Sequence, residues 1–381
     1  MEPSLSLSTD QIEQYLRDGV LVVDNFLSPA ELQTAKEGLT ATLRRHGVDP
    51  DNLEGTGRNL AKLSSTSGSG GVLDLFYDEW KLDIALKPRL FQWTQQLWKA
   101  SFICGDDDSS TASSYTELPP DEQFKWHPYG RTSPKDQGFC YIDRICYRLP
   151  TDLSNKLGRE EAAASISGPG SSSKKNKKCT LQRGLTPHLD CCPDTFDTTE
   201  NKTKWRPIQC FVSLTDNISP NTGGFEVAKG FHREFRQWAQ DRPPSRKGDT
   251  LVPAPCIGEY THIRPKEDAD IMKRIEHVPV KAGSVVFWDN RLPHANAYRH
   301  DGHMPRVVVY CSYLPPIDLN RQYAQRQLAR WRQGLNPTDQ WIGASTIIPS
   351  SDDSQSTQEK AEATFEKLSR FSRQLLAIEE W

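Results

Sequence analysis

The chain has 381 residues, of which 36% are hydrophobic and 25% charged, a composition typical of a globular protein. Its 47 basic and 50 acidic residues nearly balance, which argues against nucleic acid or an anionic membrane as a partner, because both attract clustered positive charge. The sequence shows no apolar leader and no run of about 20 apolar residues, so we expect a cytoplasmic protein that does not enter a membrane.

Two helices with capping boxes are predicted near the N-terminus. The first begins after Ser8, has a glutamine three residues later, and ends at Gly19. The second begins after Ser28, with proline at its first position and glutamate at its third. The further expectations for this part of the chain are a strand over 21–26, a loop over 47–72 and a helix over about 83–100.

The middle of the chain changes to a strand-like pattern. Short segments rich in β-branched and aromatic residues are bounded by Gly, Pro, Asn or Asp, which predicts an antiparallel barrel or sandwich and hence a mainly β fold. The segments span 141–149, 183–190, 207–214, 223–228, 283–288 and 306–314.

Residues 154–178 separate the first two of these strands. Their composition offers too little apolar surface to fold, so we predict a disordered insertion. The lysine run at 174–178 matches a nuclear import signal in composition, but a solvated loop is the simpler interpretation.

The C-terminal part, 316–381, is predicted to be a helical buttress for the sheet within one domain that spans 1–381. It contains a helical pattern over 316–332 and a second over 356–378, the latter with a capping box and an apolar stripe.

Nine cysteines are spaced irregularly and form no CxxC pair, so neither a zinc knuckle nor a thioredoxin motif is indicated. Several lie in apolar strand segments, and we interpret them as buried thiols of a protein in a reducing compartment.

Three residues of the strand-rich region have the character of metal ligands. His188 and Asp190 lie two residues apart in a predicted strand, so their side chains point to the same side. His294 follows a later strand and is expected to arrive from a facing strand. Each residue alone is as well explained by a structural role. Together they match the 2-His-1-carboxylate triad that binds non-haem Fe(II) and leaves coordination positions open.

Arg306 opens the last core strand, twelve residues after His294. A guanidinium inside an apolar fold is costly unless it is paired. The distal carboxylate of 2-oxoglutarate is a suitable bidentate partner. The expected cofactors are therefore Fe(II), 2-oxoglutarate as cosubstrate and O₂, with ascorbate as a candidate stimulant.

Several segments resemble the phytanoyl-CoA dioxygenase (PhyH-like) family of Fe(II)/2-oxoglutarate-dependent oxygenases, over most of the chain. They are QIEQYLRDGVLVVDNFLSPAEL near the start, TPHLD, NTGGFE followed by KGFH, and GSVVFWDNRLPHANAYR with Arg306.

This resemblance implies a double-stranded β-helix core with flanking helices. It implies that His188, Asp190 and His294 ligate the iron and that Arg306 anchors 2-oxoglutarate. Trp205 lies where some members place a tryptophan beside the cosubstrate, and Asn296 is expected to reach the cosubstrate as well.

Two details distinguish the chain from the pattern of this family. The family's Gly-Ser-His turn reads Gly-Phe-His here, so a structural role for His232 is the simpler interpretation. The chain does not end in Ser-Lys-Leu, which argues against a peroxisomal phytanoyl-CoA substrate. Related halogenases replace the carboxylate ligand, whereas Asp190 is present, which favours hydroxylation of a small organic substrate.

Other classes of function are compatible with the same residues. A cupin-like barrel that binds metal or a small molecule without turnover would keep similar residues. A demethylase of the JmjC or AlkB type shares the ligand pattern, but JmjC enzymes anchor the cosubstrate with lysine, and no basic face is evident. The segment around His127 either lines the substrate entrance or forms a packed aromatic turn. The oligomeric state is not predicted, and a monomer is the default.

Overall fold

The computed structural model describes residues 6–102, 115–130, 136–166, 180–200, 202–242, 245–247, 250–252, 256, 259–337 and 354–381. The lysine run at 174–178 lies outside the described residues, as does the part of the predicted insertion from 167 onward.

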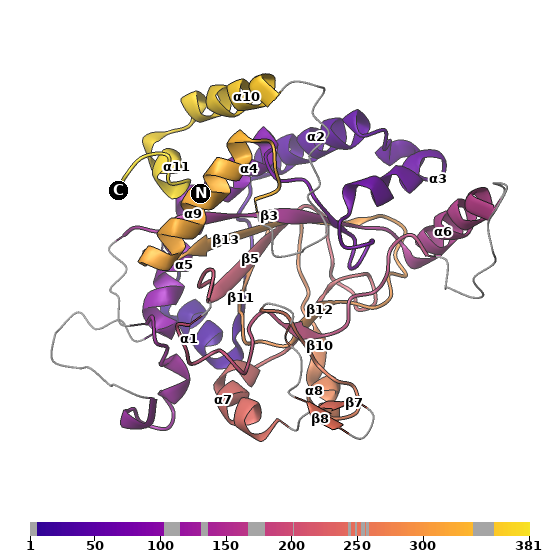
Figure 1. The fold of residues 1–381 in the computed structure, drawn as a ribbon. Coiled ribbons are helices and arrows are strands. Elements are labelled where there is room, and N and C mark those ends of the chain that lie inside the picture. The colour runs from indigo at the N-terminus through magenta and orange to yellow at the C-terminus, as the bar shows by residue number, and fades with distance from the viewer. Residues whose placement is uncertain are drawn as a thin grey trace.

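Two antiparallel sheets form the core (Figure 1), which confirms the predicted double-stranded β-helix architecture with flanking helices. The larger sheet contains, in spatial order, β1 (Val20–Val23), β11 (Val285–Asp289), β5 (Ile208–Ser213), β13 (Arg306–Leu314), β3 (Phe139–Arg148) and β2 (Val72–Leu73). The smaller contains β10 (Ile275–His277), β6 (Phe225–Ala228), β12 (His294–Asn296), β4 (His188–Leu189) and β9 (Thr261–His262). A separate hairpin joins β7 (Ser245–Lys247) to β8 (Thr250–Val252).

The strands of the larger sheet are buried on both faces, because alternate residues point to different cores. In β13, Val307 and Val309 pack in the core on the helix side, whereas Val308 packs in the core between the sheets. In β11, Phe287 likewise packs in the core on the helix side, and Trp288 packs in the core between the sheets. The inner face of this sheet therefore bounds the interior into which functional side chains can point.

The helices cover the outside of the sheets, and helical residues outnumber strand residues. They are α1 (Thr9–Asp18), α2 (Pro29–Arg45), α3 (Leu53–Thr56), α4 (Glu79–Ala85), α5 (Pro88–Ser101), α6 (Thr151–Ile166), α7 (Phe231–Asp241), α8 (Ala269–Arg274), α9 (Asp318–Arg332), α10 (Ser354–Lys367) and α11 (Arg370–Leu375). Helices α4, α5, α9 and α11 contact the larger sheet, whereas α8 contacts β6 of the smaller one. In Figure 1, α9, α10 and α11 gather above β3, and α7 and α8 lie at the opposite side of the molecule.

Local sequence signals predict several helix ends correctly. Ser8 and Ser28 both form complete capping boxes, with Gln11 and Glu31 as their partners. The helix expected over 83–100 is instead two helices, because Pro88 cannot continue α4 and takes the first turn of α5. The helix expected over 356–378 is likewise divided, since Ser369 caps α11.

The predicted disorder over 154–178 is wrong for 154–166, which belong to α6. Composition alone misses the anchors of this helix. Leu157 is fully buried, and the Ser154 hydroxyl accepts a hydrogen bond from the backbone of Gln182 at 2.8 Å. The predicted loop over 47–72 also contains α3 and two short 3₁₀ helices, which are held by the buried side chains of Leu60 and Leu63.

Across the described ranges, no helix combines the length and the apolar character that crossing a bilayer requires.

Gly19 ends α1 in the left-handed conformation, with φ +72°, and a Cβ atom there would lie 2.5 Å from Nδ1 of His232. Gly230 has a similar φ of +76°, but a Cβ atom there would meet only the Arg17 carbonyl, at 3.6 Å. We predict that Gly230→Ala lowers the free energy of unfolding by about 1 kcal/mol, the conformational cost alone. Gly19→Ala is expected to cost at least about twice as much, because His232 must also move.

Urea unfolding of both variants measures this difference. Equal losses in the two variants would show that His232 does not pack against Gly19 in solution.

Candidate metal centre

The two histidines of the predicted site lie directly opposite each other in the smaller sheet. Strands β4 and β12 are antiparallel neighbours, and their register pairs His188 with His294. The ring centroids are 4.4 Å apart, and both residues are buried. The expectation that His294 comes from a facing strand is therefore corrected. Because paired residues share a face, the adjacent strand brings the two imidazoles to the same side.

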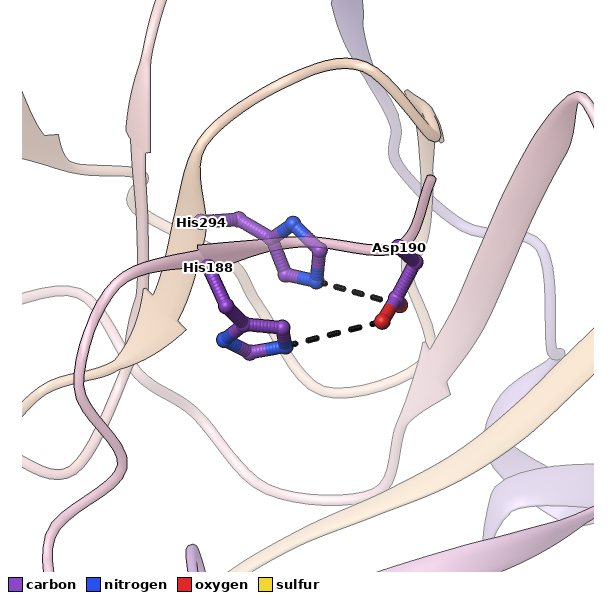
Figure 2. A group of neighbouring side chains, drawn as sticks. All are labelled: His188, Asp190 and His294. Atoms are coloured by element: carbon purple, nitrogen blue, oxygen red, sulfur yellow. Dashed lines mark ion pairs between the residues drawn. The ribbon is translucent and has the colours of Figure 1, made fainter. Parts of the chain in front are cut away.

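Asp190 follows β4 directly, and its carboxylate faces the Nε2 atoms of both rings (Figure 2). Its Oδ1 lies 3.8 Å from Nε2 of His188, and its Oδ2 lies 3.5 Å from Nε2 of His294. The structure thus brings together all three ligands that the sequence predicts.

The other ring nitrogen of each histidine is held by its own backbone. Nδ1 of His188 lies 3.0 Å from the Thr186 carbonyl, and Nδ1 of His294 lies 2.8 Å from the Leu292 carbonyl. A carbonyl oxygen only accepts, so both Nδ1 atoms carry the proton and both Nε2 atoms keep a free lone pair. This is the tautomer that a metal ligand needs.

A proline precedes each of these histidines, in Thr186-Pro187-His188 and Leu292-Pro293-His294. The residue before a proline is restricted to extended conformations. In both segments its carbonyl accepts from the histidine two positions later, while the proline carbonyl bonds to a neighbouring segment, at Ile263 or Ala228. The repeated X-Pro-His sequence therefore orients both rings in the same way.

The ionisation states of the cluster also suit a metal. Burial lowers the pKa of His188 to about 4, so its imidazole is neutral at neutral pH. Burial by itself would raise the pKa of Asp190, but the two imidazoles and Arg206 beside its carboxylate outweigh it and hold that pKa below its usual range. A neutral imidazole and an ionised carboxylate are the forms that bind a cation.

The spacing of the donors fits a single ion. The ligand atoms all lie within 4.8 Å of one another. Ligands at roughly 2.1 Å from one ion in adjacent octahedral positions are about 3 Å apart, so small side-chain rotations bring the three atoms into place. Two imidazole nitrogens and one carboxylate are the donor set of mononuclear non-haem iron sites.

Three further residues border the triad, and the sequence did not identify them. Tyr260 stacks on the His188 ring with centroids 4.5 Å apart, and Gln209 donates to Oδ2 of Asp190 at 2.9 Å. Arg206 lies 4.0 Å from the same oxygen. Gln209 could have been found from the sequence, because it is a polar residue within an apolar strand segment. Tyr260 could not, because its segment has no recognisable pattern.

Arg306 and Asn296, which are each expected to reach the cosubstrate, contact one another. Arg306 is 2% exposed, and its Nη1 donates to Oδ1 of Asn296 at 2.8 Å. Asn296 follows His294 by two residues on β12, so both point to the same side. The guanidinium also lies over the Phe211 ring, at 5.3 Å, and Phe211 in turn packs on Phe225 beside His294. These rings connect the arginine to the triad.

Trp205 lies in a different environment from the one expected of a cosubstrate residue. Its ring stacks on His127 with centroids 4.6 Å apart and packs edge-on against Phe102. His127 is buried and accepts a hydrogen bond from the backbone of Tyr129. These contacts support the packed aromatic turn for His127, and a role of Trp205 at the cosubstrate stays a prediction.

Cys192 and Cys256 form a disulfide, which the sequence did not predict. The spacing gave no signal, because 64 residues separate the partners. The bridge attaches the chain just after Asp190 to the segment that leads into β9, the neighbour of β4. The free cysteines among the described residues are all buried, namely Cys140, Cys146, Cys191, Cys210 and Cys311.

No family model matches this sequence, and no curated protein matches it. Among solved structures, GIG2 of Candida albicans, a GlcNAc-inducible DUF1479 protein, is 14% identical and covers 100% of this chain and 78% of its own, with a TM-score of 0.64. The hypothetical protein JW0805 of Escherichia coli is 14% identical over 97% of this chain and 82% of its own, with a TM-score of 0.60.

A weaker likeness extends to the epimerase SnoN of nogalamycin biosynthesis, solved with Fe³⁺ and α-ketoglutarate. It is 13% identical, covers 80% of this chain and 82% of its own, and has a TM-score of 0.39, too low to support an argument. At these identities the likenesses show the fold alone. The resemblance to the phytanoyl-CoA dioxygenase family therefore stays a prediction.

Replacing a ligand tests the centre directly. We predict that His188→Ala weakens Mn(II) binding about 100-fold or more, because it removes one of three donors. His262, which lies opposite His188 in the β4–β9 pair, provides a matched control. His262→Ala is expected to change the affinity by less than about threefold, since that imidazole is no ligand. Isothermal titration measures both, and equal losses would contradict the assigned triad.

His232 offers a test of its structural role through pH. Its Nε2 lies 3.1 Å from the Leu16 carbonyl, and burial lowers its pKa from 6.5 to about 4. Between these values the unfolded chain binds a proton that the folded protein excludes, so the free energy of unfolding falls as the pH is lowered from 6.5 towards 4. The contribution of this group is roughly 3 kcal/mol over that range.

We predict that His232→Asn reduces the pH slope by one proton, as measured by urea unfolding between pH 7 and pH 4.5. Identical slopes for the variant and the parent protein would show that His232 is protonated in the folded state.

Proposed function

We propose that this chain is an Fe(II)- and 2-oxoglutarate-dependent oxygenase that hydroxylates a small organic substrate and releases succinate and CO₂. The observation that carries the proposal is the convergence of two oriented Nε2 atoms on the Asp190 carboxylate. The buried Arg306 belongs to the same interior between the sheets.

His188, Asp190 and His294 would hold the metal at adjacent positions and leave the remaining ones for cosubstrate and O₂. When bound, the iron would supply, together with O₂ and 2-oxoglutarate, the oxidising chemistry that converts a C–H bond of the substrate to C–OH. The carbonyls of Thr186 and Leu292 keep both imidazoles in the binding tautomer. Gln209 restricts rotation of the carboxylate through its hydrogen bond to Oδ2.

Arg306 binds the distal carboxylate of 2-oxoglutarate in this proposal. The guanidinium is buried and is oriented by the Asn296 amide, which occupies part of its fork and leaves further N–H groups to donate. The distal carboxylate of a bound dicarboxylic acid compensates the charge of Arg306. The site is therefore expected to prefer 2-oxoglutarate over a 2-oxo acid that lacks this carboxylate.

Succinate formation from 2-oxoglutarate, in the presence of Fe(II) and ascorbate, tests the proposal. We expect turnover by the parent protein, none by His188→Ala, and at least a tenfold rise in KM for 2-oxoglutarate in Arg306→Met. Arg299, an exposed residue of the loop between His294 and Arg306, is paired with Asp301 and supplies the control Arg299→Met, which is expected to behave like the parent.

Metal binding without succinate formation, over a panel of candidate substrates, would instead identify a non-catalytic cupin-like binding protein. An unchanged KM for 2-oxoglutarate in Arg306→Met would show that this arginine does not bind 2-oxoglutarate.

A further inference from the structure

A second buried arginine lies beside Arg306. Strands β3 and β13 pair Arg148 directly with Arg306, and each residue is 2% exposed. Two positions along the ladder, Cys146 pairs with Val308, and both belong to the core between the sheets. Since positions two apart share a face, both guanidinium groups belong to the inner face, the same interior that holds the metal centre.

The two positive charges have no described acid to neutralise them. Within the described ranges, no carboxylate forms an ion pair with Arg148 or Arg306, whose hydrogen-bond acceptors are carbonyl, amide and thiol groups. Comparably buried arginines of this protein are compensated: Arg291 pairs with Asp289 at 2.6 Å, and Arg144 pairs with Asp74 at 2.6 Å. Like charges on directly paired residues repel each other, so the arrangement is costly without an anion.

Arg148 retains donor capacity for such an anion. Its Nη1 donates to the Arg183 carbonyl at 2.9 Å and its Nη2 to the Tyr298 carbonyl at 3.3 Å. Its Nε is buried and has no hydrogen-bond partner among the described residues. Burial, and to a smaller extent the charge of Arg306, lowers the pKa of Arg148, which is the response of a cation held in a site without an anion.

The surroundings leave little room for water to screen these charges. A Cβ atom on Gly71 would lie 2.7 Å from Cα of Arg148, and one on Gly223 would lie 3.2 Å from its Cγ. His300 closes the same region, and burial lowers its pKa to about 4, so its ring adds no charge at neutral pH. An anion at this end of the interior would therefore interact with two weakly screened guanidinium groups.

We propose that Arg148 is a second binding residue for the distal carboxylate of the cosubstrate, so that Arg148 and Arg306 form a two-guanidinium cradle for one carboxylate. This inference rests on the proposed function and extends it, because the cradle selects dicarboxylic 2-oxo acids over monocarboxylic ones. The competing role for Arg148 is structural. Its two hydrogen bonds join the segment that leads to His188 with the segment that follows His294.

Two ligands of equal carbon chain separate these roles. 2-Oxoglutarate carries the distal carboxylate, and 2-oxopentanoate has a methyl group in its place. Dissociation constants of both are measured by isothermal titration in Mn(II) without O₂, so that no turnover is required. We expect Arg148→Met to weaken 2-oxoglutarate at least tenfold and to leave 2-oxopentanoate within about twofold.

Arg148→Lys keeps the charge and is expected to retain most of the preference for the dicarboxylic acid. Arg183→Met, which removes an exposed positive charge close by, is the matched control and should change neither affinity. Thermal unfolding of each variant shows whether it is folded, and Arg148→Lys carries the comparison if Arg148→Met is not.

Equal weakening of both ligands by Arg148→Met, or loss of the preference in Arg148→Lys as well, would overturn the cradle in favour of the structural role. No effect on either ligand would also overturn it. If the parent protein itself shows no preference for 2-oxoglutarate, the proposed function fails first and the cradle fails with it.

Discussion

The backbone pairing of β4 with β12 fixes the geometry of the metal centre. Because His188 and His294 are directly opposed, their rings leave the sheet on the same side at cross-strand spacing. In each strand the carbonyl before a proline then holds Nδ1 of the histidine, so that both Nε2 lone pairs are directed at Asp190. The approach of the two histidines to Asp190 thus depends on one register, and a slip of either strand by one residue would turn its histidine to the opposite face.

The two faces of the larger sheet have different roles. Its outer residues pack against helices in the larger apolar core, whereas the inner face also carries charged side chains. Arg148 and Arg306 are placed there side by side, while Arg206 and Gln209 approach the carboxylate of Asp190 from β5 and the residues before it. The apolar outer core therefore supports an interior that holds several charged side chains.

Local signals were sufficient wherever neighbours in sequence make the decisive contacts. Ser8 and Ser28 cap their helices through residues three positions later, and the strand segments were recognisable from their β-branched and aromatic residues and from the turn residues that bound them. The failures have long-range causes. Helix α6 is stabilised by the burial of Leu157 and by a hydrogen bond from Gln182, and the disulfide joins residues 64 positions apart. Composition carries no information about such partners.

The sequence by itself determined which residues form the candidate metal centre, because His188-x-Asp190, a later His294 and an arginine at a strand start together match few kinds of site. Only the tertiary structure decided that His294 lies on the adjacent strand, that Arg148 stands opposite Arg306, and that Tyr260 stacks on His188. These contacts depend on strand order and register, which are set by packing of the whole core, so no local pattern can specify them.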